Sequence, residues 1–281
     1  MAINITPVTY HREREKGLIV YPVYSRRSEG LSIGINLFPD KKSCAFDCPY
    51  CEVFPFSDNA VFSLEQMETD LRYAIASAQK RHVQIKDICF SGNGEPSLSP
   101  HFTNALKSAE KIRAETSPSS HDAKLVVITN GTGLFQANIF SLLRETAENP
   151  HADIWLKLDA GTPEWYQKMN RCALPFEKLF EKIKEFTSCA KVTIQTMLCA
   201  INSDIPSKDE ARQWETLICE LANTADNKGG IRKVQLYGKA RPSPEDPLAC
   251  ELPAEYLEKR AASLRDKFTG KGITTLVEIY F

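Results

Sequence analysis

The stretch Lys41-Lys42-Ser43-Cys44-Ala45-Phe46-Asp47-Cys48-Pro49-Tyr50-Cys51 holds three of the chain's nine cysteines within eight residues. Three thiolates can hold three irons of a [4Fe–4S] cluster and leave the fourth iron without a protein ligand. A closed zinc site needs four ligands, and no further Cys or His follows at a zinc-like spacing. A thioredoxin-like pair needs only Cys48 and Cys51 and leaves the first cysteine unexplained. The spacing therefore favours a cluster with one iron open to a small-molecule ligand.

The composition is that of an ordinary globular protein. The chain has 281 residues, 42% hydrophobic and 25% charged, with a net charge of −1. No overall basic field favours nucleic acid or an anionic membrane, so nucleic-acid binding stays open but unsupported by charge. Residues 11–16 are charged where a signal peptide needs an apolar core. We expect a cytoplasmic protein without membrane association, in which clustered cysteines bind metal or catalyse.

Short β-rich runs alternate with longer amphipathic runs. The pattern predicts strands at 31–38, 87–91, 124–129, 153–158, 191–198 and 233–237. It predicts helices at 64–81, 102–115, 134–148, 175–187 and 208–223, then a helix at 254–267 and an apolar tail at 273–280. Strands that alternate with helices predict a parallel sheet or barrel. We expect one domain over 1–281, with a short N-terminal extension, a core of about 21–242 and a C-terminal helix–strand extension of about 243–281.

The faces of the predicted strands distinguish a flat sheet from a barrel. In the strand at 153–158 and the residue after it, Ile154, Leu156 and Leu158 share one face. The opposite face carries Trp155, Lys157 and Asp159. A flat sheet covered on both faces would be apolar on both. The pattern predicts an α/β fold, a partial (β/α)6 TIM-like barrel whose polar interior forms a ligand site at the C-terminal strand ends.

Three motifs together resemble one family. A Cys-x3-Cys-x2-Cys motif with an aromatic residue before its last cysteine, here Tyr50, resembles the signature of radical S-adenosylmethionine (SAM) enzymes. Gly92-Asn93-Gly94-Glu95-Pro96 is similar to that family's Gly-Gly-Glu motif, and Thr129-Asn130-Gly131-Thr132 follows the third predicted strand as a related segment does there. The resemblance covers about 21–242.

A narrower resemblance points to the subgroup of wyosine-type, tRNA-modifying Fe–S oxidoreductases. It rests on Pro22-Val23-Tyr24-Ser25-Arg26-Arg27, on Ser32-Ile33-Gly34-Ile35-Asn36, on Gln235-Leu236-Tyr237 and on Ala240-Arg241-Pro242. Wyosine-forming relatives hold a second cluster with cysteines upstream of the main motif. This chain has no cysteine before Cys44, so it departs from that pattern.

The resemblance implies an enzyme with two cofactors, a [4Fe–4S] cluster and S-adenosyl-L-methionine. Cys44, Cys48 and Cys51 would ligate the cluster. In this family the reduced cluster cleaves SAM to methionine and a 5′-deoxyadenosyl radical, which takes a hydrogen atom from the substrate; the protein orients the reactants and excludes water. Here the substrate is unidentified, and the resemblance implies an electron donor such as flavodoxin or ferredoxin.

The same resemblance assigns roles to single residues. Asn93, Gly94 and Glu95 would meet the methionine end of SAM, with the carboxylate accepting from its ammonium. Tyr50 would lie against the adenine or simply pack the loop. Inside the predicted barrel, Lys157 and Asp159 would contact the ligand, as cofactor-binding and catalytic groups, or pair with each other.

Further polar groups would line the predicted site or be satisfied by their neighbours: Asn130, Gln195 and Gln235. Two other functions stay open. One is a tRNA-modifying or glycyl-radical-activating enzyme with the same cofactors. The other is an iron–sulfur or zinc protein with an electron-transfer or structural role.

Overall fold

The computed structural model describes residues 17–116, 123–222 and 229–281. The charged segment at 11–16, on which the expectation of a cytoplasmic location rests, lies outside these residues. The chain forms two compact units. The first unit comprises residues 1–44, 53–129 and 149–153, and the second comprises residues 45–52, 130–148 and 154–281. The expected single domain therefore stays a prediction.

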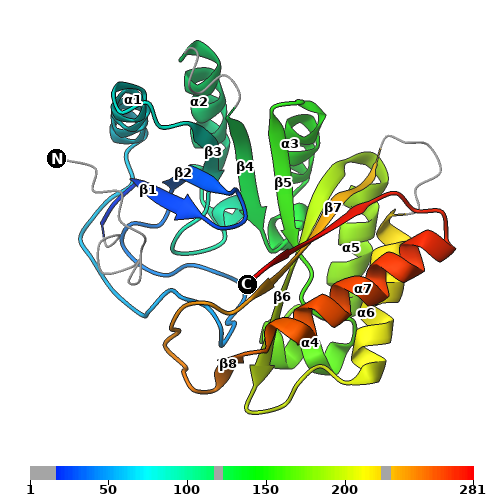
Figure 1. Ribbon diagram of the computed structural model, residues 1–281. Helices are drawn as coiled ribbons and strands as arrows, with labels where there is room; N and C mark the ends of the chain where they lie inside the picture. The colour runs from blue at the N-terminus through cyan, green and yellow to red at the C-terminus, as the bar shows by residue number, and fades with distance from the viewer. Residues whose placement is uncertain (1–16, 117–122, 223–228) are drawn as a thin grey trace. The chain divides into compact units, whose positions relative to one another are not determined.

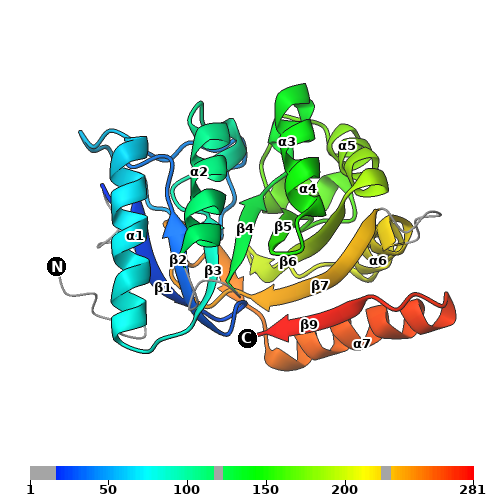
Figure 2. The same ribbon diagram turned by 90° about the horizontal axis from the view of Figure 1, so that it is seen from above.

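The first unit is built on four strands. β1 (Val20–Ser25) runs antiparallel to β2 (Gly30–Ile35), and β2, β3 (Ile85–Phe90) and β4 (Lys124–Thr129) follow in parallel (Figure 1). Helices α1 (Leu64–Lys80) and α2 (Phe102–Glu115) lie side by side over one face of this sheet (Figure 2). A 3-10 turn, η1 (Pro96–Leu98), follows β3.

The first unit's helices follow from local signals in the sequence. Ser63 caps α1, because its side chain accepts a hydrogen bond from the backbone N–H of Gln66. Apolar residues at helical spacing, Met67, Leu71 and Ile75, are buried against the sheet. Burial of that stripe fixes which face of α1 meets the strands.

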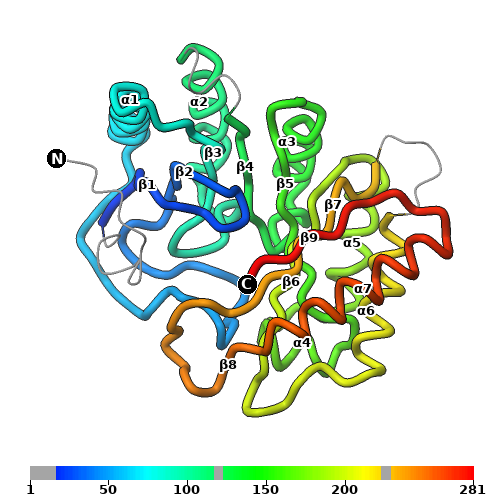
Figure 3. The backbone as a smooth tube through the Cα atoms, viewed as in Figure 1, coloured from blue at the N-terminus to red at the C-terminus, as the bar shows by residue number. Residues whose placement is uncertain are grey.

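The second unit carries a parallel sheet of its own. It contains most of β5 (Ala152–Lys157) and all of β6 (Lys191–Ile201), β7 (Gly230–Gly238) and β9 (Leu276–Tyr280), paired in that order. A short strand, β8 (Ala249–Glu251), pairs antiparallel with the end of β6. The helices are α3 (Ala137–Glu148), α4 (Pro163–Met169), α5 (Phe176–Cys189), α6 (Lys208–Ala222) and α7 (Ala254–Gly270), with a 3-10 turn η2 (Thr132–Phe135). Figure 3 traces the chain from β7 through β8 and α7 back into the sheet at β9.

Strand register in the second unit sorts its residues by face. Lys157, Gln195, Gln235 and Glu278 stand opposite one another across β5, β6, β7 and β9. The preceding residues, Leu156, Ile194, Val234 and Val277, form the adjacent row. Successive strand residues point to opposite faces, so one face is polar and the other apolar. Leu156 reaches the helix side, because a Cβ added at Gly131 would meet Leu156, Leu179 and Ile183 together. The predicted alternation is confirmed.

Most predicted elements are present. β4 and α2 have the predicted bounds, and the apolar tail contains β9. The helix predicted at 134–148 begins later, at Ala137, because the tight turn η2 precedes it. β1, α4 and β8 were not predicted. In the part of the chain that the structure describes, no helix combines the length and apolarity needed to cross a membrane.

Candidate active site

The cysteine loop is anchored by its first residues. Ser43 forms an isolated parallel bridge with Gly94: its N–H donates to the Asn93 carbonyl at 2.9 Å, and its carbonyl accepts from the Glu95 N–H at 2.9 Å. Cys44 follows directly and is exposed. The start of the loop is therefore held by the turn that follows β3.

The remaining two cysteines lie in the second unit. Cys48 and Cys51 are partly exposed, and the Cys51 N–H donates to the Cys48 carbonyl at 2.9 Å, which closes a turn between them. Burial raises the pKa of the Cys48 thiol to about 12, although the Lys157 ammonium opposes the shift. In the metal-free chain Cys48 is therefore a neutral thiol.

Gly94 is explained by the close approach of the cysteine loop. A Cβ at this position would lie 1.8 Å from the Ser43 carbonyl oxygen, a separation that no side chain tolerates. The prediction placed this glycine where a backbone must come close to SAM. The structure shows that the neighbour it must admit is the backbone of the chain itself. A role toward SAM stays a prediction.

Asn93 and Glu95 are both buried and both bonded within the first unit. The Asn93 amide donates to the Phe38 carbonyl at 3.1 Å. Glu95 Oε1 accepts from the Ser97 N–H at 3.2 Å, the Ser97 hydroxyl at 2.5 Å and the Thr129 hydroxyl at 2.7 Å. Glu95 thereby caps η1. These bonds fix one carboxylate oxygen and orient the group.

In the second unit, Tyr50 and Asp159 form a buried hydrogen bond. The Tyr50 hydroxyl donates to Asp159 Oδ2, and the Met197 N–H donates to Oδ1 at 2.9 Å. Tyr50 is 6% exposed. Burial, and then the Asp159 charge, raise the pKa of the phenol well above its ordinary value. Tyr50 is therefore a neutral donor that ties the cysteine loop to the end of β5.

Lys157 completes a charged network on the polar face. Its ammonium lies 3.4 Å from Asp159 Oδ2 and 2.5 Å from the Tyr237 hydroxyl. The Tyr50 and Tyr237 rings stand on either side, with centroids 5.1 and 5.2 Å away. Burial alone would lower the pKa of Lys157, but the neighbouring Asp159 and Tyr237 raise it above the ordinary value. Lys157 is a fixed cation on the polar face of the second unit's sheet, and its place inside a barrel stays a prediction.

Three other predicted residues are bonded to neighbours. The Asn130 side chain accepts from the Thr132 N–H at 3.0 Å and the Thr132 hydroxyl at 2.7 Å, which shapes the turn before η2. The Gln195 amide donates to Gln235 at 2.8 Å, and both residues are fully buried. Each therefore has a structural role, and contact with a ligand stays a prediction for all three.

Sequence reasoning missed Asn170. This buried residue ends α4, and its amide lies within hydrogen-bonding distance of Asp159, Tyr50 and Cys48. Arg171 follows it and pairs with Glu245 at 2.7 Å. An asparagine after a short helix resembles an ordinary helix end. No sequence signal distinguished it, because its partners lie in two segments distant from each other in the sequence, the cysteine loop and the stretch just after β5.

The donor set fits an iron–sulfur cluster in its chemistry. Three thiols within one loop are the ligands that such clusters take, and the Lys157 cation beside Cys48 favours a thiolate there. The three predicted ligands are divided between the two units: Cys44 belongs to the first, and Cys48 and Cys51 belong to the second. Among the described residues no three His, Cys, Asp or Glu side chains are arranged to hold a metal ion. The ligand assignment therefore stays a prediction.

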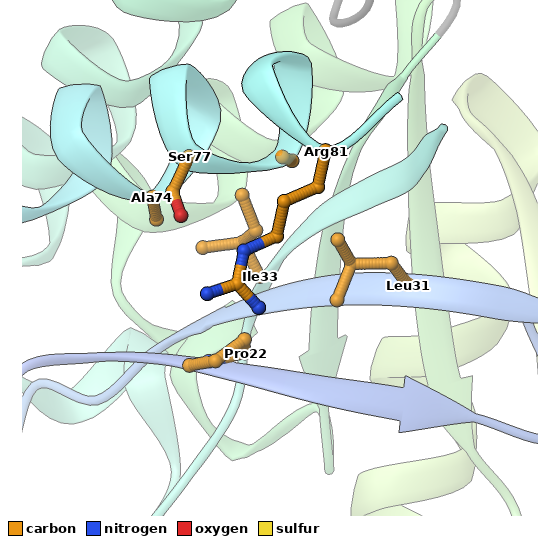
Figure 4. A pocket seen from close by; sticks show the side chains of 7 residues that line it. Pro22, Leu31, Ile33, Ala74, Ser77 and Arg81 are labelled. Carbon is orange, nitrogen blue, oxygen red and sulfur yellow. The ribbon is translucent and has the colours of Figure 1, made fainter. Parts of the chain in front are cut away.

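A pocket of the first unit shares no lining residue with the predicted site. Its lining comes from β1, β2 and α1 and comprises Pro22, Leu31, Ile33, Ala74, Ser77, Ala78 and Arg81 (Figure 4). The Arg81 side chain extends from α1 toward Ile33 and Pro22. None of the predicted site residues lines it.

Comparison with known proteins places the chain among radical SAM folds. No protein-family model matches it. Over 274 residues it is 24% identical to a UPF0026 protein of Helicobacter pylori strain J99. This alignment covers 93% of this chain and 83% of the Helicobacter protein.

Among solved structures, Streptococcus suis SuiB bound to precursor peptide SuiA matches with a TM-score of 0.62 and 15% identity over 90% of this chain. The match covers 50% of the SuiB chain, so this chain spans about half of SuiB's length. SuiB has also been solved bound to S-adenosylmethionine. A radical SAM methyltransferase from Sphaerobacter thermophilus matches with a TM-score of 0.61 and 15% identity, over 92% of this chain and 68% of that protein. The chain has the fold of these radical SAM proteins, so the predicted fold class is confirmed.

Proposed function

We propose that this protein is a radical SAM enzyme that holds a [4Fe–4S] cluster with Cys44, Cys48 and Cys51. The observation that carries the proposal is the buried network of Tyr50, Lys157 and Asp159, which ties the cysteine loop to the polar face of a radical SAM fold. A bound, reduced cluster would supply the electron needed to break a sulfur–carbon bond of SAM.

The chain's own residues bind and orient SAM in this proposal. The Lys157 ammonium is a fixed donor for a carboxylate or hydroxyl, and Asp159 is an acceptor beside it. Glu95 is held by Ser97 and Thr129, so its carboxylate is oriented before a ligand ammonium arrives. Tyr50, neutral and buried, keeps Asp159 from turning away.

The substrate is unidentified, and the electron donor is proposed to be a flavodoxin- or ferredoxin-type protein. SuiB is a structural neighbour bound to a precursor peptide, which makes peptides a reasonable first class of substrate to screen. The net charge of −1 gives no comparable support to RNA.

The test is anaerobic reconstitution with iron and sulfide, followed by iron analysis and electron paramagnetic resonance. We expect about four irons per chain and a spectrum of the reduced protein that changes when SAM is added. Replacing Cys44, Cys48 and Cys51 together by Ala should abolish the iron. A matched control replaces three cysteines elsewhere, Cys189, Cys219 and Cys250, and should keep it. Iron that survives the first triple change refutes the proposal.

A further inference from the structure

Asn170 is fixed in place by its position at the end of α4. It is 1% exposed, and its N–H donates to the Tyr166 carbonyl at 2.8 Å, which completes the last turn. Thr162 caps the other end of α4 by accepting from the Trp165 N–H at 3.2 Å. Because α4 is short and capped at both ends, Asn170 has little freedom to move away from its neighbours.

Both the backbone and the side chain of Asn170 hold the cysteine loop. Its carbonyl accepts from the Asp47 N–H at 2.9 Å. Its side-chain Nδ2 lies 3.5 Å from the Cys48 sulfur. The next residue, Arg171, adopts a left-handed backbone with φ of 46° and places its guanidinium 3.8 Å from the Asp47 carboxylate. A left-handed backbone costs free energy in a residue other than glycine. Asn170 and Arg171 both contact the cysteine loop, the first through hydrogen bonds and the second through an ion pair.

The chemistry of the surroundings fixes which end of the Asn170 amide faces them. Nδ2 lies 3.0 Å from Asp159 Oδ2 and 3.4 Å from the Tyr50 hydroxyl oxygen. A carboxylate accepts hydrogen bonds only, so the NH2 group, not the carbonyl oxygen, must face Asp159. One of its two hydrogens serves Asp159, and the other is available to the sulfur and the phenol.

A hydrogen bond to a ligating sulfur acts on an iron–sulfur cluster through its charge. A reduced cluster carries one more negative charge than an oxidised one, and an N–H directed at sulfur stabilises that charge. Reduction potentials accordingly depend on hydrogen bonds to the sulfurs. A donor that also anchors the loop backbone would hold this hydrogen bond, and its contribution to the reduction potential, at a fixed geometry.

We propose that Asn170 is a positioning residue that donates from its side-chain amide to the Cys48 sulfur and thereby raises the reduction potential of the cluster. The inference rests on the proposed function, because it requires the cluster to be held by Cys48. Asn170 acts on the cluster through that thiolate and makes no contact with a reacting atom.

The experiment is a redox titration with dithionite, followed by electron paramagnetic resonance, on reconstituted full-length protein without SAM. Asn170→Leu keeps a similar volume and removes the donor. Loss of one hydrogen bond should disfavour reduction roughly two- to tenfold, which moves the midpoint potential negative by up to about 59 mV. Asn170→Ser is a second, smaller replacement that serves if the leucine disturbs packing.

Gln167→Leu is the matched control. Gln167 lies on the same helix, and its side-chain amide donates to the Cys172 carbonyl at 3.0 Å rather than to the cysteine loop. The midpoint reduction potential of the Gln167→Leu variant should equal that of the wild type. Iron-loaded Asn170 variants with an unchanged midpoint potential overturn the inference. If neither Asn170 variant takes up iron, the inference is also overturned, because Asn170 would then be needed to form the loop and not to set the reduction potential. A wild-type protein that takes up no iron overturns the proposed function, and the inference with it.

Discussion

The turn after β3 and the network at the end of β5 lie in different units and are built in different ways. In the turn, Asn93 and the Glu95 N–H bond to the backbone of other segments, and two hydroxyls fix the Glu95 carboxylate. In the network, the Lys157 cation and the Asp159 anion are held between two tyrosines. The first region depends on shape and the second on charge. Substitutions that change volume should therefore damage the turn, and substitutions that change charge should damage the network.

The largest effect is expected from Gly94→Ala. Its Cβ would overlap the Ser43 carbonyl oxygen, which is backbone and cannot move aside. We expect a loss of about 4 kcal/mol or more in the free energy of unfolding, measured by urea denaturation. Gly270→Ala is the control: nothing lies within 4 Å of its added Cβ, so stability should stay equal or rise. Equal stability of both variants would show that the turn admits a side chain.

Lys157→Met tests the charged network, because it keeps the length of the side chain and removes the cation. Asp159, whose side chain is fully buried, would lose its ion-pair partner. We expect a loss of about 3 kcal/mol in the free energy of unfolding. Adding Asp159→Asn should restore much of that loss, since no unpaired charge then remains. A single variant as stable as the wild type would mean that hydrogen bonds alone satisfy Asp159.

Glu95→Gln separates a structural role of Glu95 from a binding role. The amide oxygen can still accept from Ser97 and Thr129, so stability should change little. Loss of the charge should weaken SAM binding by about 1.5–3 kcal/mol, or roughly ten- to a hundredfold, measured by calorimetry on reconstituted protein. Glu95→Ala should weaken SAM binding in the same way and lower stability as well. Unchanged affinity in both variants would leave Glu95 with its capping role alone.

The smallest effect concerns the cysteines of the metal-free chain. Cys44 is exposed, whereas burial raises the pKa of Cys48 to about 12 and keeps it a neutral thiol at pH 8. Only the thiolate reacts with iodoacetamide, so Cys48 should react at least about tenfold more slowly than Cys44. Peptide mass spectrometry over time measures both rates, and the rate of Cys48 should keep rising above pH 10. Equal rates would contradict the raised pKa of Cys48.

The sequence was informative where a local pattern carries the structure. The alternation around Lys157 predicted both the strand and the face of its side chain, because strand geometry has a fixed period. The reason for Gly94 could not be predicted, since its neighbour Ser43 lies far along the chain. Tyr237 belongs to a quoted motif, yet its contact with Lys157 depends on the pairing of β5, β6 and β7.

Asn170 shows the limit most clearly. One asparagine after a short helix predicts only a helix end, and its bonds to the cysteine loop arise from tertiary packing. β8 was missed for a related reason: three residues are too few to show a period, and the strand exists because the end of β6 offers it a partner. Contacts between segments distant in sequence thus account for most of what was not predicted.

The most direct test of the central claim is product analysis. The reconstituted protein is reduced with dithionite under anaerobic conditions, given SAM, and examined by chromatography for 5′-deoxyadenosine and methionine. We expect both products in equal amounts, and neither from the variant with Cys44, Cys48 and Cys51 replaced by Ala. An iron-loaded, reduced protein that leaves SAM intact, with and without candidate peptide substrates, would contradict the account and favour an electron-transfer or structural iron–sulfur protein.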